Sequence, residues 1–425
     1  MTNLSLKHLR IIKTCNLYAS SIASGISMAV IGPTLLNLQE IVHTDIEHIA
    51  LIYDGRSSGY LVGSLVGGVL FDVTPRKQFL MTVFNFLIAV SLLAVPWCRS
   101  MGTIAGWLVI NGLSMGALDT GLNVCCLNLW GQDCGPFYQA LHFMYGFGSL
   151  LAPLIASPFL DDYHETTSMN DSMSFTGNTS TWDSVELIVN TSNTLTWDSV
   201  GLTVDTSNTS TWDSVELTGN ISNTYQNDKF PSITYAYTII GIYAFVVTVA
   251  FFIVCIISPL DASGNKNEAN KTKQNGFMFI SMIVTLTFLL LFFETGTEIG
   301  FAQMVTAYSV KGPLKLTAVA GSYITSAYWA AFTLSRFSSI FLAIKFSSLS
   351  VVVLDLTFFT AGTVVLLFWA GSKEWCLWLA TILLGIGIAS FMLQLSHGLN
   401  VTSTSPIKFL DYLQLVLLLV KWSSR

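Results

Sequence analysis

Long apolar segments alternate with short polar ones along most of the 425-residue chain. A membrane-spanning helix needs about 20 mostly apolar residues. A further apolar run at 409–420 has only 12 residues and is too short to span. The pattern predicts an all-α polytopic membrane protein with about ten full spans and one partial span. The ten full segments are 15–37, 49–71, 78–97, 103–128, 137–160, 233–258, 276–308, 317–344, 349–370 and 375–395.

Composition and charge support this class. Only 10% of the residues are charged, whereas soluble proteins have about 25%. Placing the N-terminus in the cytosol puts ten basic residues inside and five outside, in agreement with the positive-inside bias. The seven cysteines show no disulfide or metal spacing. We expect no enzyme activity, no cofactor and no nucleic-acid partner, since no supported nucleophile or metal cluster appears.

A polar insert at 161–231 interrupts the apolar pattern. It holds 11 of the 25 acidic residues, and a 15-residue repeat begins at Thr179, Thr194 and Thr209. We predict an extracellular, glycosylated loop without a fixed fold. The alternative is a carbohydrate-binding face formed by the repeated tryptophans Trp182, Trp197 and Trp212. The N-x-[ST] acceptors are Asn170, Asn178, Asn190, Asn208 and Asn220.

The insert and a second polar stretch divide the chain. Residues 259–275 are polar and are expected to form a cytosolic linker between two sets of helices. The predicted order is helices one to five at 1–160, the insert at 161–231, helix six at 232–258, the linker at 259–275, helices seven to ten at 276–398, and an atypical short tail at 399–425.

The first two predicted helices carry packing signals. Gly32 and Pro33 in the first helix indicate a kink. Gly59, Gly63 and Gly67 recur at every fourth residue of the second helix. Such spacing gives one flat face that a neighbouring helix can approach closely.

Arg56 is unusual because it lies about 12 Å inside the outer end of the second helix, at 1.5 Å per residue. We expect it to snorkel outward, to pair with Asp54 or Asp45, or to take part in solute binding or gating. Residues 55–59 also fit the G-x-S-x-G hydrolase pattern. That pattern needs a strand–turn–helix setting, and a membrane helix does not provide one.

Polar residues gather in the fourth and fifth predicted helices. Asp119 and Asn123 lie on the fourth, and Gln139 and His142 lie on the fifth. A carboxylate inside a span costs about 2.5–3.5 kcal/mol and by default faces the bundle interior or a wet cavity. We interpret these residues as one wall of a solute pathway.

The seventh predicted helix carries two further acids. Glu294 and Glu298 are one turn apart and share a face. Their neighbours Gly296 and Gly300 indicate a partly unwound site that attracts a cation, and Gln303 lies about one turn further along. The alternative is pairing of the acids at an outer gate with a base, either Lys311 or Lys315.

The turn between the second and third predicted helices resembles the signature of the major facilitator superfamily. The matching residues are Gly68, Leu70, Asp72, Arg76, Lys77 and Leu80, while Pro75 stands where glycine is usual. We expect Asp72, Arg76 and Lys77 to form a conformational latch, with Arg336 on the eighth helix as its second-half partner.

Residues 116–143 indicate which branch of the superfamily the chain resembles. Residues 116–124 read GALDTGLNV, 130–131 read WG, and 139–143 read QALHF. They resemble the sodium-dependent glucose transporter branch of the superfamily, the major facilitator domain-containing protein 4 group, which is related to fucose–proton symporters. The resemblance implies two six-helix halves, with the second half truncated here. It also implies that Asp119 couples to a cation, that Gln139 binds sugar, and that His142 lies near a second sugar contact.

Chemistry and resemblance together predict a plasma-membrane hexose carrier that is coupled to Na⁺ and works by alternating access. Its partners would be a hexose, Na⁺ and the lipid bilayer. Sugar hydroxyls need amide, imidazole and carboxylate partners, and Na⁺ needs oxygen ligands. The alternatives are a carrier of a polyol, urea or an organic ion, and a truncated membrane protein that does not transport. The candidate sugar residues are Asn123, Gln139, His142 and Gln303, and the candidate cation residues are Asp119, Glu294 and Glu298.

Overall fold

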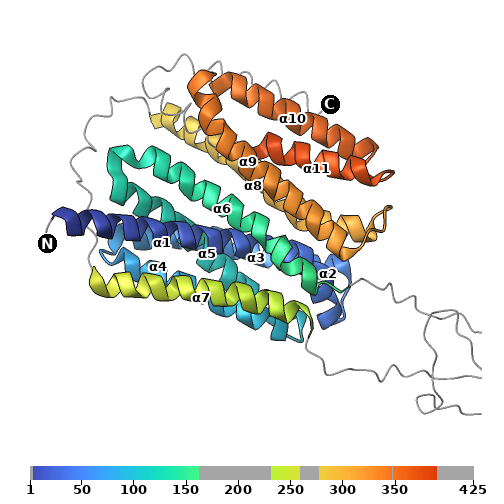
Figure 1. The fold of residues 1–425 in the computed structure, drawn as a ribbon, viewed down its shortest axis with the longest axis horizontal. Coiled ribbons are helices and arrows are strands. Elements are labelled where there is room, and N and C mark those ends of the chain that lie inside the picture. The colour runs from blue at the N-terminus through green and yellow to red at the C-terminus, as the bar shows by residue number, and fades with distance from the viewer. Residues whose placement is uncertain (1–2, 162–230, 259–276, 347, 390–425) are drawn as a thin grey trace, which may run out of the picture. The chain divides into compact units, whose positions relative to one another are not determined.

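The computed structural model describes residues 3–161, 231–258, 277–346 and 348–389, which belong to one compact unit. The repeats with their five acceptor asparagines, the linker 259–275 and the tail 399–425 lie outside the described residues. The described part consists of helices (Figure 1). They are α1 (Asn3–Ala29), α2 (Ile31–Val42), α3 (Ile46–Val73), α4 (Lys77–Ala94), η1 (Val95–Trp97), α5 (Met101–Trp130), η2 (Gly131–Asp133), α6 (Cys134–Ala156), η3 (Ser157–Phe159), α7 (Ile233–Ile257), α8 (Phe277–Lys311), α9 (Ala318–Lys345), α10 (Ser348–Phe368) and α11 (Glu374–Ala389).

The helices match the predicted apolar segments to within a few residues wherever these are described, except the first, which was predicted at 15–37 and in fact begins at Asn3 and ends at Val42. Local chemistry sets some of the boundaries. The Ser100 side chain accepts a hydrogen bond from the Thr103 amide at 3.3 Å and starts α5. Thr317 does the same for α9 through the Ala320 amide at 3.2 Å. Such caps satisfy amides that the first helical turn leaves without partners.

Five of the described helical segments are long and apolar enough to cross a membrane, and the bent pair α1 and α2 adds a sixth. These five are α4 with η1, α5, α6 with η3, α7 and α10. The remaining long helices are richer in glycine, hydroxyl and charged residues, as in α3 and α9. The chain is therefore a multi-pass membrane protein, and the count of ten spans stays a prediction.

The first predicted span is broken into α1 and α2, whose axes differ by 48°. Pro33 explains the break, because it has no backbone N–H and cannot donate to the carbonyl of Ala29. The kink predicted from Gly32 and Pro33 is confirmed.

Helices α3 and α5 approach each other at their backbones. Gly63 lies against the carbonyl of Leu113 on α5, and Gly116 of α5 lies against the carbonyl of Tyr60 on α3. A side chain at either glycine would occupy the space of the facing backbone. The predicted glycine face is confirmed, and α5 is the helix that packs on it.

Adding one methyl group to this interface is expected to destabilise the protein. The Cβ of a Gly63→Ala variant would collide with the Leu113 backbone, whereas a Cβ at Gly68 meets no atom within 4 Å. We expect Gly63→Ala to lower the free energy of unfolding by about 1–3 kcal/mol. Gly68→Ala should leave it unchanged or raise it slightly. Melting temperatures in detergent measure both, and equal values for the two variants would contradict the packing.

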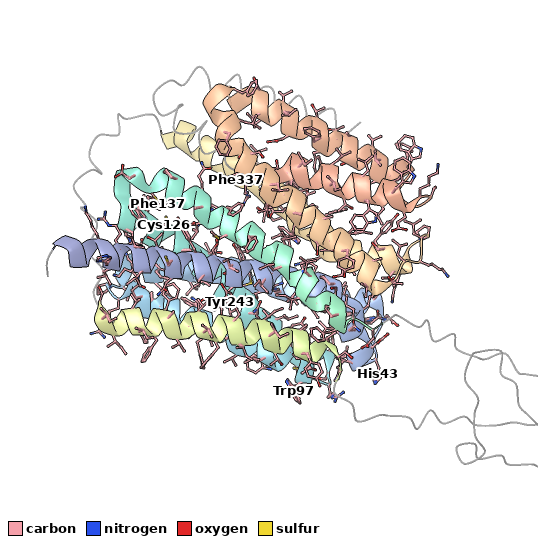
Figure 2. The ribbon with its side chains drawn as sticks, viewed as in Figure 1. His43, Trp97, Cys126, Phe137, Tyr243 and Phe337 are labelled. Carbon is pink, nitrogen blue, oxygen red and sulfur yellow. The ribbon has the colours of Figure 1, made fainter. Side chains whose placement is uncertain are left out.

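Helices from the two parts of the chain share one buried apolar core. Leu17 of α1, Leu118 of α5, Phe332 of α9 and Ile388 of α11 all belong to it. Figure 2 shows His43 and Trp97 at one end of the helices and Cys126 and Phe137 at the other. We call the former the α2 end, because His43 directly follows α2.

The two cysteines nearest the α5–α6 turn lie together although their spacing predicts no disulfide. The sulfurs of Cys126 and Cys134 are 3.4 Å apart, and both thiols are free and buried. This contact joins the end of α5 to the start of α6.

Candidate functional site

Asp119 lies half-buried on α5 and has a defined partner. The hydroxyl of Tyr60 on α3 donates a hydrogen bond to its carboxylate at 3.0 Å. The contact depends on the close approach of α3 and α5 at Gly63 and Gly116. Packing of small residues therefore positions the acid that the sequence singles out.

Arg336 on α9 connects Asp119 to the acids of α8. Its guanidinium lies close enough to act electrostatically on Asp119 and on both Glu294 and Glu298. Arg336 also donates through Nε to the Ala389 carbonyl at 3.0 Å and lies over the Phe332 ring at 4.4 Å. Its electrostatic partners are therefore these acids, whereas the sequence assigned it to the turn at Asp72.

Tyr145 on α6 interacts with acids from both halves of the chain. Its hydroxyl is within electrostatic range of both Asp119 and Glu298. Its ring makes an edge contact with Trp329 of α9, with centroids 6.4 Å apart. Tyr328 is buried beside Trp329 and donates to the Glu298 carbonyl at 3.1 Å. We call Asp119, Glu298, Arg336, Tyr60 and Tyr145 the central cluster.

Glu294 and Glu298 are both buried, with 9% and 7% of their surface exposed. The Thr295 hydroxyl donates to one Glu294 oxygen at 3.3 Å. The other oxygen, Oε1, has no hydrogen-bond partner among the described residues. A buried carboxylate oxygen without a donor is free to bind a cation or a solute hydroxyl.

The expectation of an unwound site at Gly296 and Gly300 is wrong, because α8 is a continuous helix from Phe277 to Lys311. A glycine costs a helix only about 1 kcal/mol relative to alanine. Breaking the helix in an apolar setting would leave several backbone groups without partners, at several kcal/mol each. The helix therefore continues through both glycines.

The predicted sugar residues fall into two places. Asn123, Gln139 and His142 are half-buried on α5 and α6. Asn123 Oδ1 has no partner in the described part of the chain, and the His142 ring lies 4.6 Å from that of Tyr138 and within electrostatic range of Arg336. The Gln303 backbone instead contacts α2 and α3 near the α2 end.

The predicted latch is not formed in this structure. Asp72 and Arg76 are exposed and Lys77 is half-buried. Within the described residues, no hydrogen bond or ion pair joins Asp72 to either base. The latch stays a prediction for another conformation.

Sequence reasoning missed the contacts made by three residues, Arg56, Tyr60 and Tyr145. Arg56 neither snorkels nor pairs with Asp54 or Asp45, because it is 3% exposed and donates to backbone carbonyls of α1. Tyr60 directly follows Gly59 on the face that meets α5. Its position next to Gly59 could have indicated from the sequence that Tyr60 lies near α5.

No three histidine, cysteine, aspartate or glutamate side chains converge on a possible metal site in the described part. The central cluster instead combines carboxylate, hydroxyl and guanidinium groups. These groups can bind a monovalent cation and a polyhydroxylated solute through oxygen ligands and hydrogen bonds.

No family model matches the chain, but individual proteins and solved structures do. Human sodium-dependent glucose transporter 1 is 29% identical over 378 residues, which cover 88% of this chain and 64% of the relative. Major facilitator superfamily domain-containing protein 4A of Xenopus tropicalis is 38% identical over 138 residues, covering 32% of this chain and 27% of the relative.

A solved structure shares the fold. A crystal structure of a mutant of the nucleoside transporter NupG superposes with a TM-score of 0.57 at 11% identity, covering 90% of this chain and 81% of that one. These proteins carry transporter and superfamily names and none is an enzyme, as predicted from the sequence. The chain is therefore a homologue of the proteins named sodium-dependent glucose transporter 1 and major facilitator superfamily domain-containing protein 4A, and it shares the fold of the transporter NupG.

Proposed function

We propose that the chain carries a hexose across the plasma membrane together with Na⁺ by alternating access, with its N-terminus in the cytosol. The observation that carries the proposal is the central cluster. In it, Asp119 of the first half lies within electrostatic range of Arg336 of the second half, and Tyr145 lies within electrostatic range of Glu298. A solute bound there touches both halves, so its binding can be linked to their relative movement.

The charges of the site favour a cation. Asp119, Glu294 and Glu298 supply three acids, and Arg336 is the base that acts on all three. When the acids are ionised, an excess of negative charge remains in an apolar setting, where a bound cation lowers the energy. The unpartnered oxygens of Glu294 and Asn123 are suitable Na⁺ ligands.

The same region suits a sugar. Gln139 and His142 offer donors and acceptors for hydroxyl groups. The half-buried Tyr145 offers an aromatic ring on which the C–H groups of a sugar can pack. The names of the relatives, sodium-dependent glucose transporter, point to the same solute and ion.

Alternating access needs contacts between the halves that can break. Three lie near the α2 end. Lys311 donates to the Gln39 side chain at 2.9 Å, Ser322 donates to the Pro153 carbonyl at 2.7 Å, and the Tyr53 hydroxyl donates to the Gln303 carbonyl at 3.3 Å. We interpret these three hydrogen bonds as closing the α2 end, and they would break when the solute enters from that side.

The test is uptake of radiolabelled glucose by proteoliposomes that contain the purified chain. We expect an inward Na⁺ gradient to increase the initial rate several-fold over an equal K⁺ gradient. Competition by unlabelled hexoses, polyols, urea and organic ions then defines the solute class. Uptake that competes with urea or an organic ion but not with hexoses would replace the hexose proposal by the alternative carrier.

A further inference from the structure

Arg56 is a buried cation that the proposed sugar and ion sites do not use. It lies on α3 with 3% of its surface exposed. Its terminal nitrogens donate to the Ser27 carbonyl at 2.8 Å and to the Met28 carbonyl at 3.2 Å. One of them also contacts the Met115 sulfur at 3.0 Å, while its Nε has no partner among the described residues.

The two carbonyls belong to the last turn of α1, immediately before the 48° bend into α2. Carbonyls in the last turn of a helix lack intrahelical partners and must be satisfied by other groups. The planar guanidinium of Arg56 can donate to both at once. Arg56 therefore ties α3 to the place where the first span bends.

The groups around Arg56 do not balance its charge. The side chains within electrostatic range of it are the hydroxyls of Tyr53, Tyr145 and Tyr237. No acid forms an ion pair with it in the described part of the chain. Burying a cation without a counter-ion is costly. A neutral side chain would serve for packing alone, so the charge indicates a specific task at the bend.

Beyond the bend, α2 makes the contacts that close the α2 end. Gly32 lies against the backbone of Ala302 and Gln303 on α8, and Gln39 accepts the hydrogen bond from Lys311. Tyr53, one turn before Arg56 on α3, donates to the Gln303 carbonyl. The same segment of α3 thus contacts both the bend and the helix on which α2 closes.

We propose that Arg56 is a positioning residue that holds the α1–α2 bend, and thereby holds α2 closed against α8. The inference rests on the proposed alternating access, of which this closure is one step. Arg56 acts through the backbone of α1 and not by contact with the solute. Loosening its two hydrogen bonds frees α2 to leave α8.

Thiol labelling of purified protein in detergent tests this without any solute. Ala302→Cys places a reporter that is 3% exposed under Gly32, and Asp45→Cys places a reporter on an exposed turn. A water-soluble maleimide should label the thiol introduced by Ala302→Cys, followed in its own peptide by mass spectrometry because Cys15 is also exposed, about tenfold faster when Arg56→Met is added. A hydrogen bond from a charged donor is worth about that factor. Arg56→Lys should give an intermediate rate, since an ammonium cannot reproduce the planar fork.

The controls separate loosening of α2 from general unfolding. Labelling of the Asp45→Cys chain should be the same with and without Arg56→Met. Ser20→Ala removes a buried 2.9 Å hydrogen bond between α1 and Asn85 of α4, and it should not change labelling of Ala302→Cys. Equal rates for Ala302→Cys with Arg56 and with Met would overturn the proposal. If the Arg56→Met chain does not fold, the same comparison with Arg56→Lys decides it.

Failure of this inference and failure of the proposed function give different results. The labelling experiment contains neither hexose nor Na⁺. A chain that labels as expected but takes up no hexose would keep the positioning role of Arg56 and refute the transported solute. A chain that takes up hexose, but in which Arg56→Met leaves the labelling rate of Ala302→Cys unchanged, would support the transported solute and refute the positioning role of Arg56.

Discussion

Asp119→Asn is expected to abolish Na⁺-dependent hexose accumulation while leaving the protein folded. Asparagine keeps an acceptor for the Tyr60 hydroxyl, which lies 3.0 Å from the carboxylate, so the α3–α5 contact remains. The substitution removes the charge on which Arg336 acts. Asparagine cannot supply the negative charge that a bound cation needs, so we expect the rate to fall at least about tenfold, which corresponds to about 1.4 kcal/mol. The initial rate of glucose uptake into proteoliposomes measures the loss.

Asp133→Asn is the matched control. Asp133 is exposed and lies in η2, directly after α5. The Asp133→Asn substitution therefore removes the same charge as Asp119→Asn, but outside the central cluster. It should transport like the unsubstituted chain. An Asp119→Asn chain whose uptake still responds to Na⁺ as before would remove Asp119 from cation coupling.

Arg336→Met is expected to cause the largest loss of stability. Arg336 is the base that acts on Asp119, Glu294 and Glu298 together. Removing it leaves these acids without the positive charge that acts on them, and an unbalanced buried charge destabilises the folded protein. We expect a lowered melting temperature in detergent and reduced amounts of folded protein.

A second substitution separates charge from packing. Glu298→Gln in the Arg336→Met chain removes one uncompensated acid and should restore part of the melting temperature. Lys373→Met removes an exposed base near the start of α11 and should change the melting temperature little. If Glu298→Gln lowers stability further in the Arg336→Met background, the two side chains do not compensate each other.

Much of the fold could be predicted from the apolar pattern. A helix in lipid must satisfy its own backbone hydrogen bonds, so the length of an apolar segment determines the length of the helix. The acids of the site, Asp119 and Glu298, could be found because ionisable residues inside spans are rare and costly. The glycine face of α3 was readable from its spacing of four residues.

The partners of these residues could not be predicted. Tyr60 and Tyr145 are aromatic residues in a chain with 12% aromatic residues, so their identity alone carries no signal. Position along a helix gives the depth of Arg336 but not the direction in which it points. Arg56 binds backbone carbonyls, and every residue has one, so these partners cannot be recognised from residue types. Such contacts depend on how each helix is rotated and at what angle it crosses its neighbours. Several packing arrangements fit the same apolar pattern equally well, so the sequence does not select one of them.

The central claim is that one cluster between the halves couples Na⁺ to hexose movement. The most direct measurement is the internal glucose concentration of proteoliposomes under an inward Na⁺ gradient, before and after a sodium ionophore removes that gradient. We expect glucose to accumulate above the external concentration and the accumulation to collapse when the ionophore is added. Glucose that only equilibrates across the membrane, with or without the gradient, would contradict it.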